Sequence, residues 1–125
     1  MKTILVDAWN TFVTNEGINK DMQQLLDSYN NPKIILTNAN AEELISLGIV
    51  NMPYPVFSLA HNPNKPNPEY YQKMLDHYAL ASKEVLYFEH HEDAVKSARY
   101  LSIDTLWLKK GSSLQTLKQF LDQNI

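Results

Sequence analysis

The sequence contains no cysteine, no long hydrophobic run and no cluster of basic residues. The absence of cysteine excludes disulfide bonds, thiolate metal ligands and a cysteine nucleophile. No apolar stretch reaches the length of a membrane-spanning helix or of a signal-peptide core, so we expect a cytoplasmic protein that does not enter a membrane. The net charge is -3 and the charges are interspersed, which is unlike a surface that binds phosphates, and we expect no nucleic-acid partner.

The composition is that of a globular protein. Of the 125 residues, 44% are hydrophobic and 20% are charged, which argues against a disordered or fibrous chain. A chain of this length buries enough surface for one hydrophobic core and is too short for two. We therefore expect a single domain over residues 1–125.

Short apolar runs alternate with longer amphipathic segments along the whole chain. The runs have the length of buried strands and lie at residues 3–6, 33–36, 56–59, 85–88 and 105–108. The amphipathic segments have helical spacing and lie at residues 19–29, 41–47, 67–78, 93–101 and 112–121. This alternation predicts an α/β fold of the doubly wound, three-layer, Rossmann-like kind, with a mostly parallel five-stranded sheet.

Polar residues follow the predicted strands at the points where ligands bind in such sheets. Asp7 follows the first strand, Thr37 and Asn38 follow the second, Lys65 precedes a helix, and residues 89–93 (EHHED) follow the fourth strand. In an open parallel sheet, ligands bind beyond the carboxyl ends of the strands. A carboxylate, a hydroxyl, an amide and an ammonium meeting at this edge are suited to attack, orient and neutralise a charged substrate.

Four segments resemble, in order, the four motifs of the haloacid dehalogenase-like (HAD) superfamily. They are residues 4–12 (ILVDAWNTF), 34–38 (IILTN), 64–71 (NKPNPEYY) and 86–95 (LYFEHHEDAV). The superfamily's optional cap domains are inserted between the first and second or the second and third motifs, and neither interval here has room for one. The chain thus resembles a minimal, capless member with degenerate first and fourth motifs.

This resemblance implies a hydrolase that acts on a phosphorylated small molecule through an aspartate nucleophile. By resemblance, Asp7 is the nucleophile and Lys65 balances its charge. The residues implied to contact the substrate are Trp9, Thr11, Thr37 and Asn38. Capless members either act on large, accessible substrates or recruit a partner, so a protein partner or a second copy covering the open site is also implied.

Two departures from the motifs predict atypical or reduced activity. Trp9 stands where the phosphatases carry a second aspartate, their general acid and base, a group typically worth about 10²–10⁴ in rate. His90 and Ala94 stand where the family carries acids or amides. We therefore expect a weak Mg²⁺ site, with Asp7, Glu89 and Asp93 as its ligands. Alternatively, Glu89, His90 and Asp93 offer the mixed nitrogen and oxygen ligands that suit zinc.

The same residues also have simpler interpretations. Asp7 at a strand end and Thr37 with Asn38 in a turn are able to bond local main chain, and Lys65 is able to pair with Asp7 without any chemistry. Asp93 lies in a predicted first helical turn, where a negative charge complements free amides. Together with Trp9, His90 and Ala94 in place of the usual polar groups, which motivate it, they leave open a second class of function, a catalytically inactive scaffold that binds a ligand or a protein. Two further histidines lack ligand spacing and are predicted to be surface or partly buried residues: His61 and His77.

Overall fold

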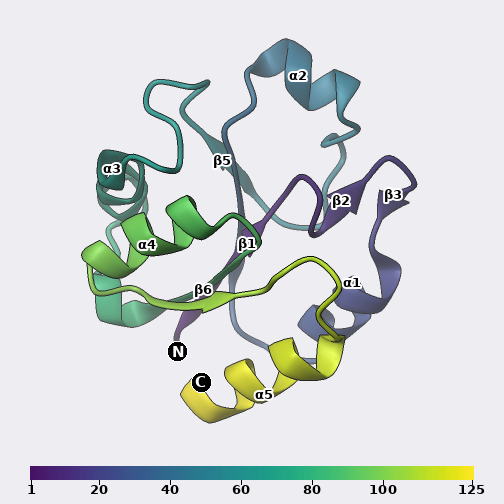
Figure 1. Ribbon diagram of the computed structural model, residues 1–125, viewed down its shortest axis with the longest axis vertical. Coiled ribbons are helices and arrows are strands. Elements are labelled where there is room, and N and C mark those ends of the chain that lie inside the picture. Colours follow the sequence, from purple (N-terminus) through teal and green to yellow (C-terminus); the bar gives the residue numbers. More distant parts are fainter.

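The computed structural model describes all residues from Met1 to Ile125 and is built around one parallel sheet (Figure 1). The strand order across the sheet is β5-β4-β1-β6-β7, and every neighbouring pair is parallel. The strands are β1 (Thr3–Asp7), β4 (Lys33–Thr37), β5 (Val56–Ser58), β6 (Val85–Glu89) and β7 (Asp104–Trp107). The predicted five-stranded α/β architecture is therefore confirmed.

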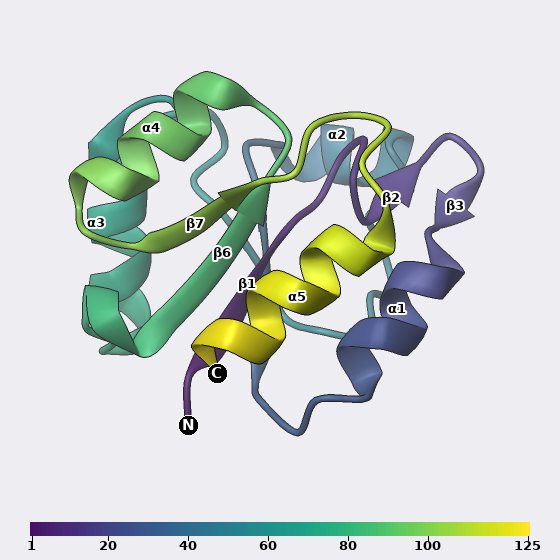
Figure 2. The same cartoon turned by 60° about the horizontal axis from the view of Figure 1, so that its bottom comes forward.

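Helices cover both faces of the sheet, which gives three layers (Figure 2). The helices are α1 (Lys20–Asp27), α2 (Ala41–Ser46), α3 (Pro68–Tyr78), α4 (Glu92–Tyr100) and α5 (Leu114–Asn124), with a short 3-10 turn at Ser82–Glu84. Buried side chains of α1 and α5 join one hydrophobic cluster, and those of α3 and α4 join the other. None of the helices has the length and hydrophobicity that crossing a membrane requires.

The two clusters divide the side chains of each central strand between the two faces. In β1, Ile4 and Val6 belong to the cluster with α1 and α5, whereas Leu5 belongs to the cluster with α3 and α4. In β6, Leu86 and Tyr87 alternate in the same way. Because successive side chains of a strand point to opposite faces, a strand covered on both sides is apolar throughout. Burial contributes roughly 1.5–3 kcal/mol for each large apolar side chain, and it holds β1 in place up to Asp7, its last residue.

One local element was not predicted, a small hairpin directly after β1. It consists of β2 (Val13–Thr14) and β3 (Gly17–Ile18), which pair antiparallel. Gly17 has a φ of 99°, a conformation that is strained for residues with a side chain. Strands of two residues are too short for hydrophobic periodicity to detect. No domain is inserted between β1 and β4 or between β4 and α3, in agreement with the predicted capless architecture.

Candidate functional site

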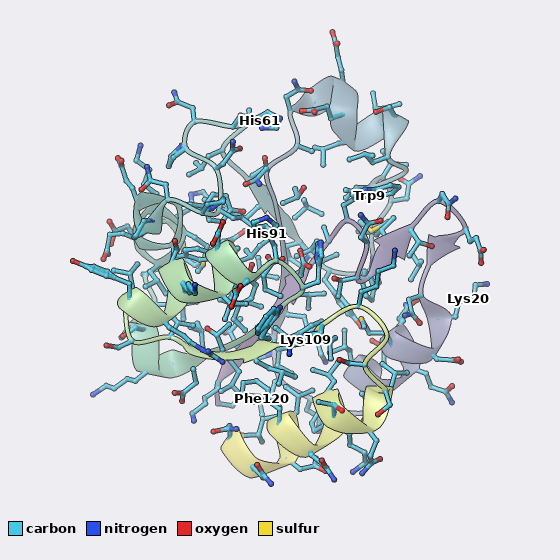
Figure 3. All side chains as sticks on the ribbon, in the orientation of Figure 1. Trp9, Lys20, His61, His91, Lys109 and Phe120 are labelled. Atoms are coloured by element: carbon cyan, nitrogen blue, oxygen red, sulfur yellow. The ribbon has the colours of Figure 1, made fainter.

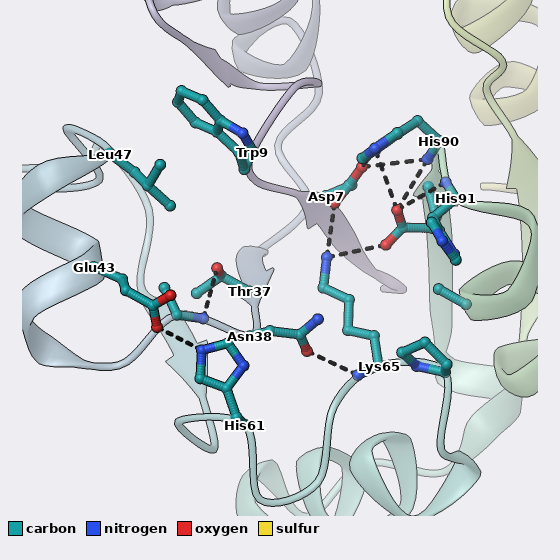
Figure 4. Close-up of a pocket in the computed structure, with 14 residues that line it drawn as sticks. Asp7, Trp9, Thr37, Asn38, Glu43, Leu47, His61, Lys65, His90 and His91 are labelled. Atoms are coloured by element: carbon teal, nitrogen blue, oxygen red, sulfur yellow. Dashed lines mark hydrogen bonds and ion pairs between the residues drawn. The ribbon is translucent and has the colours of Figure 1, made fainter.

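A pocket of about 260 Å³ lies at the carboxyl end of the central strands (Figure 4). Its walls come from the segments after β1, β4 and β6, from α2, and from the loop before α3. We call it the Asp7 pocket, and its lining residues are Asp7, Trp9, Thr37, Asn38, Ala39, Glu43, Leu47, His61, Lys65, Pro66, Glu89, His90, His91 and Ala94. Segments that are far apart in the sequence therefore meet at one edge of the sheet, as the motif order predicted.

Lys65 lies at the centre of the pocket, between two carboxylates. Its Nζ donates to Asp7 Oδ1 at 2.7 Å and to Glu89 Oε1 at 2.9 Å, and its side chain is only 7% exposed. Burial favours the neutral amine, but the charges of Asp7 and Glu89 outweigh it and raise the pKa of Lys65 well above its usual value. The main-chain N–H of Lys65 donates to Asn38 Oδ1 at 2.7 Å, so Asn38 holds the lysine in place.

Asp7 is 1% exposed, and both of its carboxylate oxygens accept hydrogen bonds. Oδ1 accepts from Lys65, and Oδ2 accepts from Thr11 Oγ1 at 2.6 Å, from His90 Nδ1 at 2.5 Å and from the His90 main-chain N–H at 3.2 Å. Burial alone would raise the pKa of Asp7, but Lys65 and His90 outweigh it and hold this pKa well below its usual range. Asp7 is therefore ionised at neutral pH.

Glu89 provides the second carboxylate beside Lys65. Its Oε2 accepts from the main-chain N–H groups of His90 and His91, each at 3.1 Å, and its Oε1 accepts from Lys65 and from the Tyr87 hydroxyl. Burial raises the pKa of Glu89, and Lys65 opposes this shift. Tyr87 was not predicted as a site residue, although residues two apart on a strand share a face, so its contact with Glu89 was detectable in principle.

The far wall of the pocket is formed by α2 and by the loop that carries His61. His61 Nε2 pairs with Glu43 Oε1 at 2.5 Å, and its Nδ1 contacts Asn64 Oδ1 at 2.8 Å. Because both ring nitrogens face oxygen acceptors, both donate, and hydrogen bonds to Glu43 and Asn64 raise the pKa of His61. Figure 3 shows Trp9, His61 and His91 on three separate segments. His61 is exposed, as predicted for a surface histidine, but its place in this wall was not foreseen.

The structure brings most of the predicted site residues together and leaves two outside the lining. Thr11 lies behind Asp7, buried, and contacts its carboxylate rather than the pocket. Asp93, predicted as a metal ligand, is exposed in the first turn of α4. It does not line the pocket, and it is not in the group of possible metal ligands that Asp7, Glu89 and His90 form. Its position in the first turn of α4 follows from the free amides of the helix N-terminus, which a negative charge complements. Thr37 is buried in the lining, and its Oγ1 accepts from the Ala39 main-chain N–H at 3.2 Å.

The size of the acidic cluster fits a metal ion, but its bonding does not fit Mg²⁺. Asp7, Glu89 and His90 each offer a ligand atom, and these atoms lie within 4.8 Å of one another. However, all four carboxylate oxygens already accept hydrogen bonds from protein donors. Mg²⁺ prefers oxygen ligands in a near-octahedral arrangement, and here an imidazole lies between the two carboxylates.

No protein-family model matches the sequence, and no curated protein is significantly similar to it. Solved structures do match its fold. An HAD family enzyme from Bacteroides thetaiotaomicron, an aspartate-to-alanine mutant in complex with magnesium and inorganic phosphate, matches with a TM-score of 0.66 and 19% identity over 81% of this chain. An HAD-superfamily hydrolase of subfamily IA from Geobacter sulfurreducens matches with a TM-score of 0.55 and 20% identity over 71% of this chain.

A third structure matches over nearly its whole length. It is the core domain of a candidate phosphoglycolate phosphatase from Streptococcus pneumoniae, with a TM-score of 0.64, 15% identity, and coverage of 98% of this chain and 96% of that one. By contrast, this chain spans 58% of the Bacteroides enzyme and 45% of the Geobacter hydrolase, about half of their length. The fold is therefore like that of the HAD core domains, which is the fold that the resemblance implied.

Proposed function

We propose that this chain is an HAD-like hydrolase, a single core domain over residues 1–125 that cleaves a phosphorylated small molecule at a reduced rate. The observation that carries this proposal is the buried contact between Lys65 Nζ and Asp7 Oδ1 at 2.7 Å, in a pocket at the sheet edge. An ionised carboxylate fixed beside an ammonium combines a nucleophile with a group that stabilises negative charge. The names of the matched structures, a hydrolase and a candidate phosphatase, support the same class of reaction.

The reaction that this arrangement supports has two steps. A carboxylate oxygen of Asp7 attacks the phosphorus of the monoester, and the bond from phosphorus to the leaving-group oxygen breaks. Water then hydrolyses the acyl phosphate on Asp7, which releases inorganic phosphate and restores the carboxylate. Throughout, Lys65 offsets negative charge at Asp7, while Thr37 and Asn38 offer a hydroxyl and an amide to the phosphoryl oxygens.

Trp9 limits the substrates on which this mechanism works. An indole donates a hydrogen bond but does not act as an acid at neutral pH, so the leaving group departs without a proton from this position. Aryl phosphates, whose leaving groups are stable as anions, therefore react, whereas alkyl phosphates react more slowly by about 10²–10⁴, the usual contribution of a general acid.

The test compares Asp7→Asn with the wild type on p-nitrophenyl phosphate and on an alkyl phosphate, with and without added magnesium or manganese. Asp76→Asn on the exposed surface of α3 is the matched control, because it makes the same chemical change outside the pocket. We expect Asp7→Asn to lose the aryl phosphatase activity and the control to retain it, with both proteins folded by circular dichroism. Equal rates for the wild type and Asp7→Asn would refute the nucleophile.

A second candidate function is binding without turnover, with a protein partner or a second copy covering the open edge. The observation that favours it is the number of donors on Asp7 Oδ2, which already accepts from Thr11 and twice from His90. A carboxylate so fully bonded is a weaker nucleophile than a free one. Binding of inorganic phosphate by a wild-type protein that releases no phosphate from aryl esters would favour this candidate over the hydrolase.

A further inference from the structure

Around Asp7, Glu89 and Lys65, the acceptors of the Asp7 pocket have hydrogen-bond partners and several donors have unused protons. Every oxygen of Asp7 and Glu89 accepts from at least one protein donor. Several donors of the lining keep unused protons. Lys65 Nζ makes two hydrogen bonds out of three, Asn38 Nδ2 makes none, and Thr37 Oγ1 only accepts. Around Lys65 the pocket therefore offers hydrogen-bond donors to an anion and no free carboxylate oxygen to a cation, whereas Glu43 Oε2 on the far wall accepts no hydrogen bond.

His90 takes a particular position among these groups. Its Nδ1 lies 2.5 Å from Asp7 Oδ2 and 3.3 Å from Glu89 Oε2, so a single N–H faces both carboxylates. A cation that bridged Asp7 and Glu89 would need the same oxygens. The Nε2 of His90 makes no hydrogen bond in the structure and is a further polar atom in the lining, since His90 borders the pocket and its side chain is 31% exposed.

The main chain holds this arrangement in place. His90 N–H donates both to Asp7 Oδ2 at 3.2 Å and to Glu89 Oε2 at 3.1 Å, and Trp107 Nε1 donates to the His90 carbonyl at 3.0 Å. The main chain of His90 is thus held at its N–H and at its carbonyl, and this fixes the position of the imidazole. Moving it aside for a metal would break several hydrogen bonds at once, and Ala94 on the neighbouring helix offers no replacement ligand.

We propose that the Asp7 pocket binds its phosphate-type anion without a divalent metal ion, because His90 and Lys65 occupy the carboxylate oxygens that such an ion would need. This inference deepens the proposed function and rests on it for the class of ligand. It also separates this chain from its Bacteroides neighbour, which was solved in complex with magnesium and inorganic phosphate. The role of Lys65 and His90 toward the carboxylates is one of positioning and charge balance.

The experiment measures binding and does not require turnover. Titration calorimetry of the full chain uses magnesium chloride alone, and then inorganic phosphate in the presence of either magnesium or a chelator. We expect no magnesium binding below millimolar concentration, and a phosphate affinity that changes by less than twofold between magnesium and chelator. Magnesium binding in the micromolar range, phosphate binding that requires magnesium, or no phosphate binding at all would each overturn the inference.

Two variants sharpen the result. His90→Asp removes the imidazole and restores a carboxylate, so we expect it to bind magnesium at least tenfold more tightly than the wild type. His77→Asp on α3 makes the same substitution outside the pocket lining and is expected to leave magnesium binding unchanged. The wild-type titrations decide the inference even if His90→Asp does not fold. If Asp7→Asn kept full activity, the proposed function would fail, but the inference from these binding results would still hold. If hydrolysis through Asp7 required magnesium, the proposed function would hold, and only the inference of a metal-free site would be overturned.

Discussion

Replacing Lys65 with methionine removes the only ammonium between Asp7 and Glu89 and keeps most of the buried side-chain volume. The ligand atoms of the two carboxylates lie within 4.8 Å of each other. With an effective dielectric constant of about 20, two unit charges at that distance repel by about 3.5 kcal/mol. The same repulsion is present in the wild type, where the ion pairs of Lys65 with Asp7 and Glu89 offset it. Removing one partner of a buried ion pair costs about 3–5 kcal/mol in measured cases.

We therefore expect Lys65→Met to lower the free energy of unfolding by about 3–5 kcal/mol at neutral pH. Urea unfolding measures this loss, and with a slope of about 1.5 kcal/mol per molar the midpoint falls by about 2–3 M. The matched control is Lys73→Met on α3, whose ammonium pairs with Glu69 Oε1 at 3.2 Å and whose side chain is 49% exposed. An exposed pair of this kind contributes about 0–1 kcal/mol.

The loss of stability in Lys65→Met also depends on pH, with a defined sign. Burial raises the pKa of Glu89, and Lys65 is the group that opposes this shift, so removing Lys65 raises the pKa further. A folded-state pKa above the unfolded value means that the folded protein binds the proton more tightly, and stability falls as pH rises through that pKa. The deficit relative to the wild type is therefore smaller in mild acid than in mild base. A loss no greater than that of Lys73→Met, or a deficit that does not change with pH, would refute the reasoning.

Three further predictions address other parts of the structure. Glu43→Gln removes the carboxylate that raises the pKa of His61, so an NMR titration should show this pKa lower than in the wild type, and an unchanged value would contradict the pairing. Tyr70→Phe deletes a hydroxyl that donates to main-chain carbonyls of β4 and β5 at 2.8 and 3.2 Å, and urea unfolding should show a loss of about 1–3 kcal/mol. Leu86→Ala opens a cavity at a fully buried position and should cost about 2–5 kcal/mol by the same assay, whereas a cost below that would show that the core collapses around it.

Strands and helices were predictable because the pattern of burial is simple. A strand covered by helices on both faces is apolar at every position, and each of the five apolar runs forms a strand within one or two residues of its predicted bounds. Polar caps fixed the helix starts: Asn67 accepts from the Glu69 N–H, and Pro68 occupies the first turn of α3. The β2–β3 hairpin was missed because its strands have two residues each.

The candidate site was predictable only as far as chain order determines it. Asp7 and Glu89 end neighbouring parallel strands, so their meeting follows from the topology. The wall formed by His61 and Glu43 does not, because it depends on a loop in which His61 has a φ of 67° and donates its main-chain N–H to the Asn38 carbonyl. The prolines and asparagines of residues 61–68 indicate a loop, but not the conformation that His61 adopts in it. The way in which Lys65 divides its hydrogen bonds between two carboxylates likewise depends on side-chain placement within a few tenths of an ångström.

The wall of the pocket that α2 forms is less stable locally than the strand ends on the other side. The helix has six residues, none of them buried, and begins with a capping box between Asn40 and Glu43. The strands beneath it are buried along almost their whole length. Amide hydrogens of α2 should therefore exchange with solvent through local opening, while those of β1 exchange only when the whole protein unfolds. If the pocket binds the phosphate monoester that we propose, the buried strand ends would hold the phosphate in a fixed position, and local opening of α2 would let the pocket accept groups of different size at the other end.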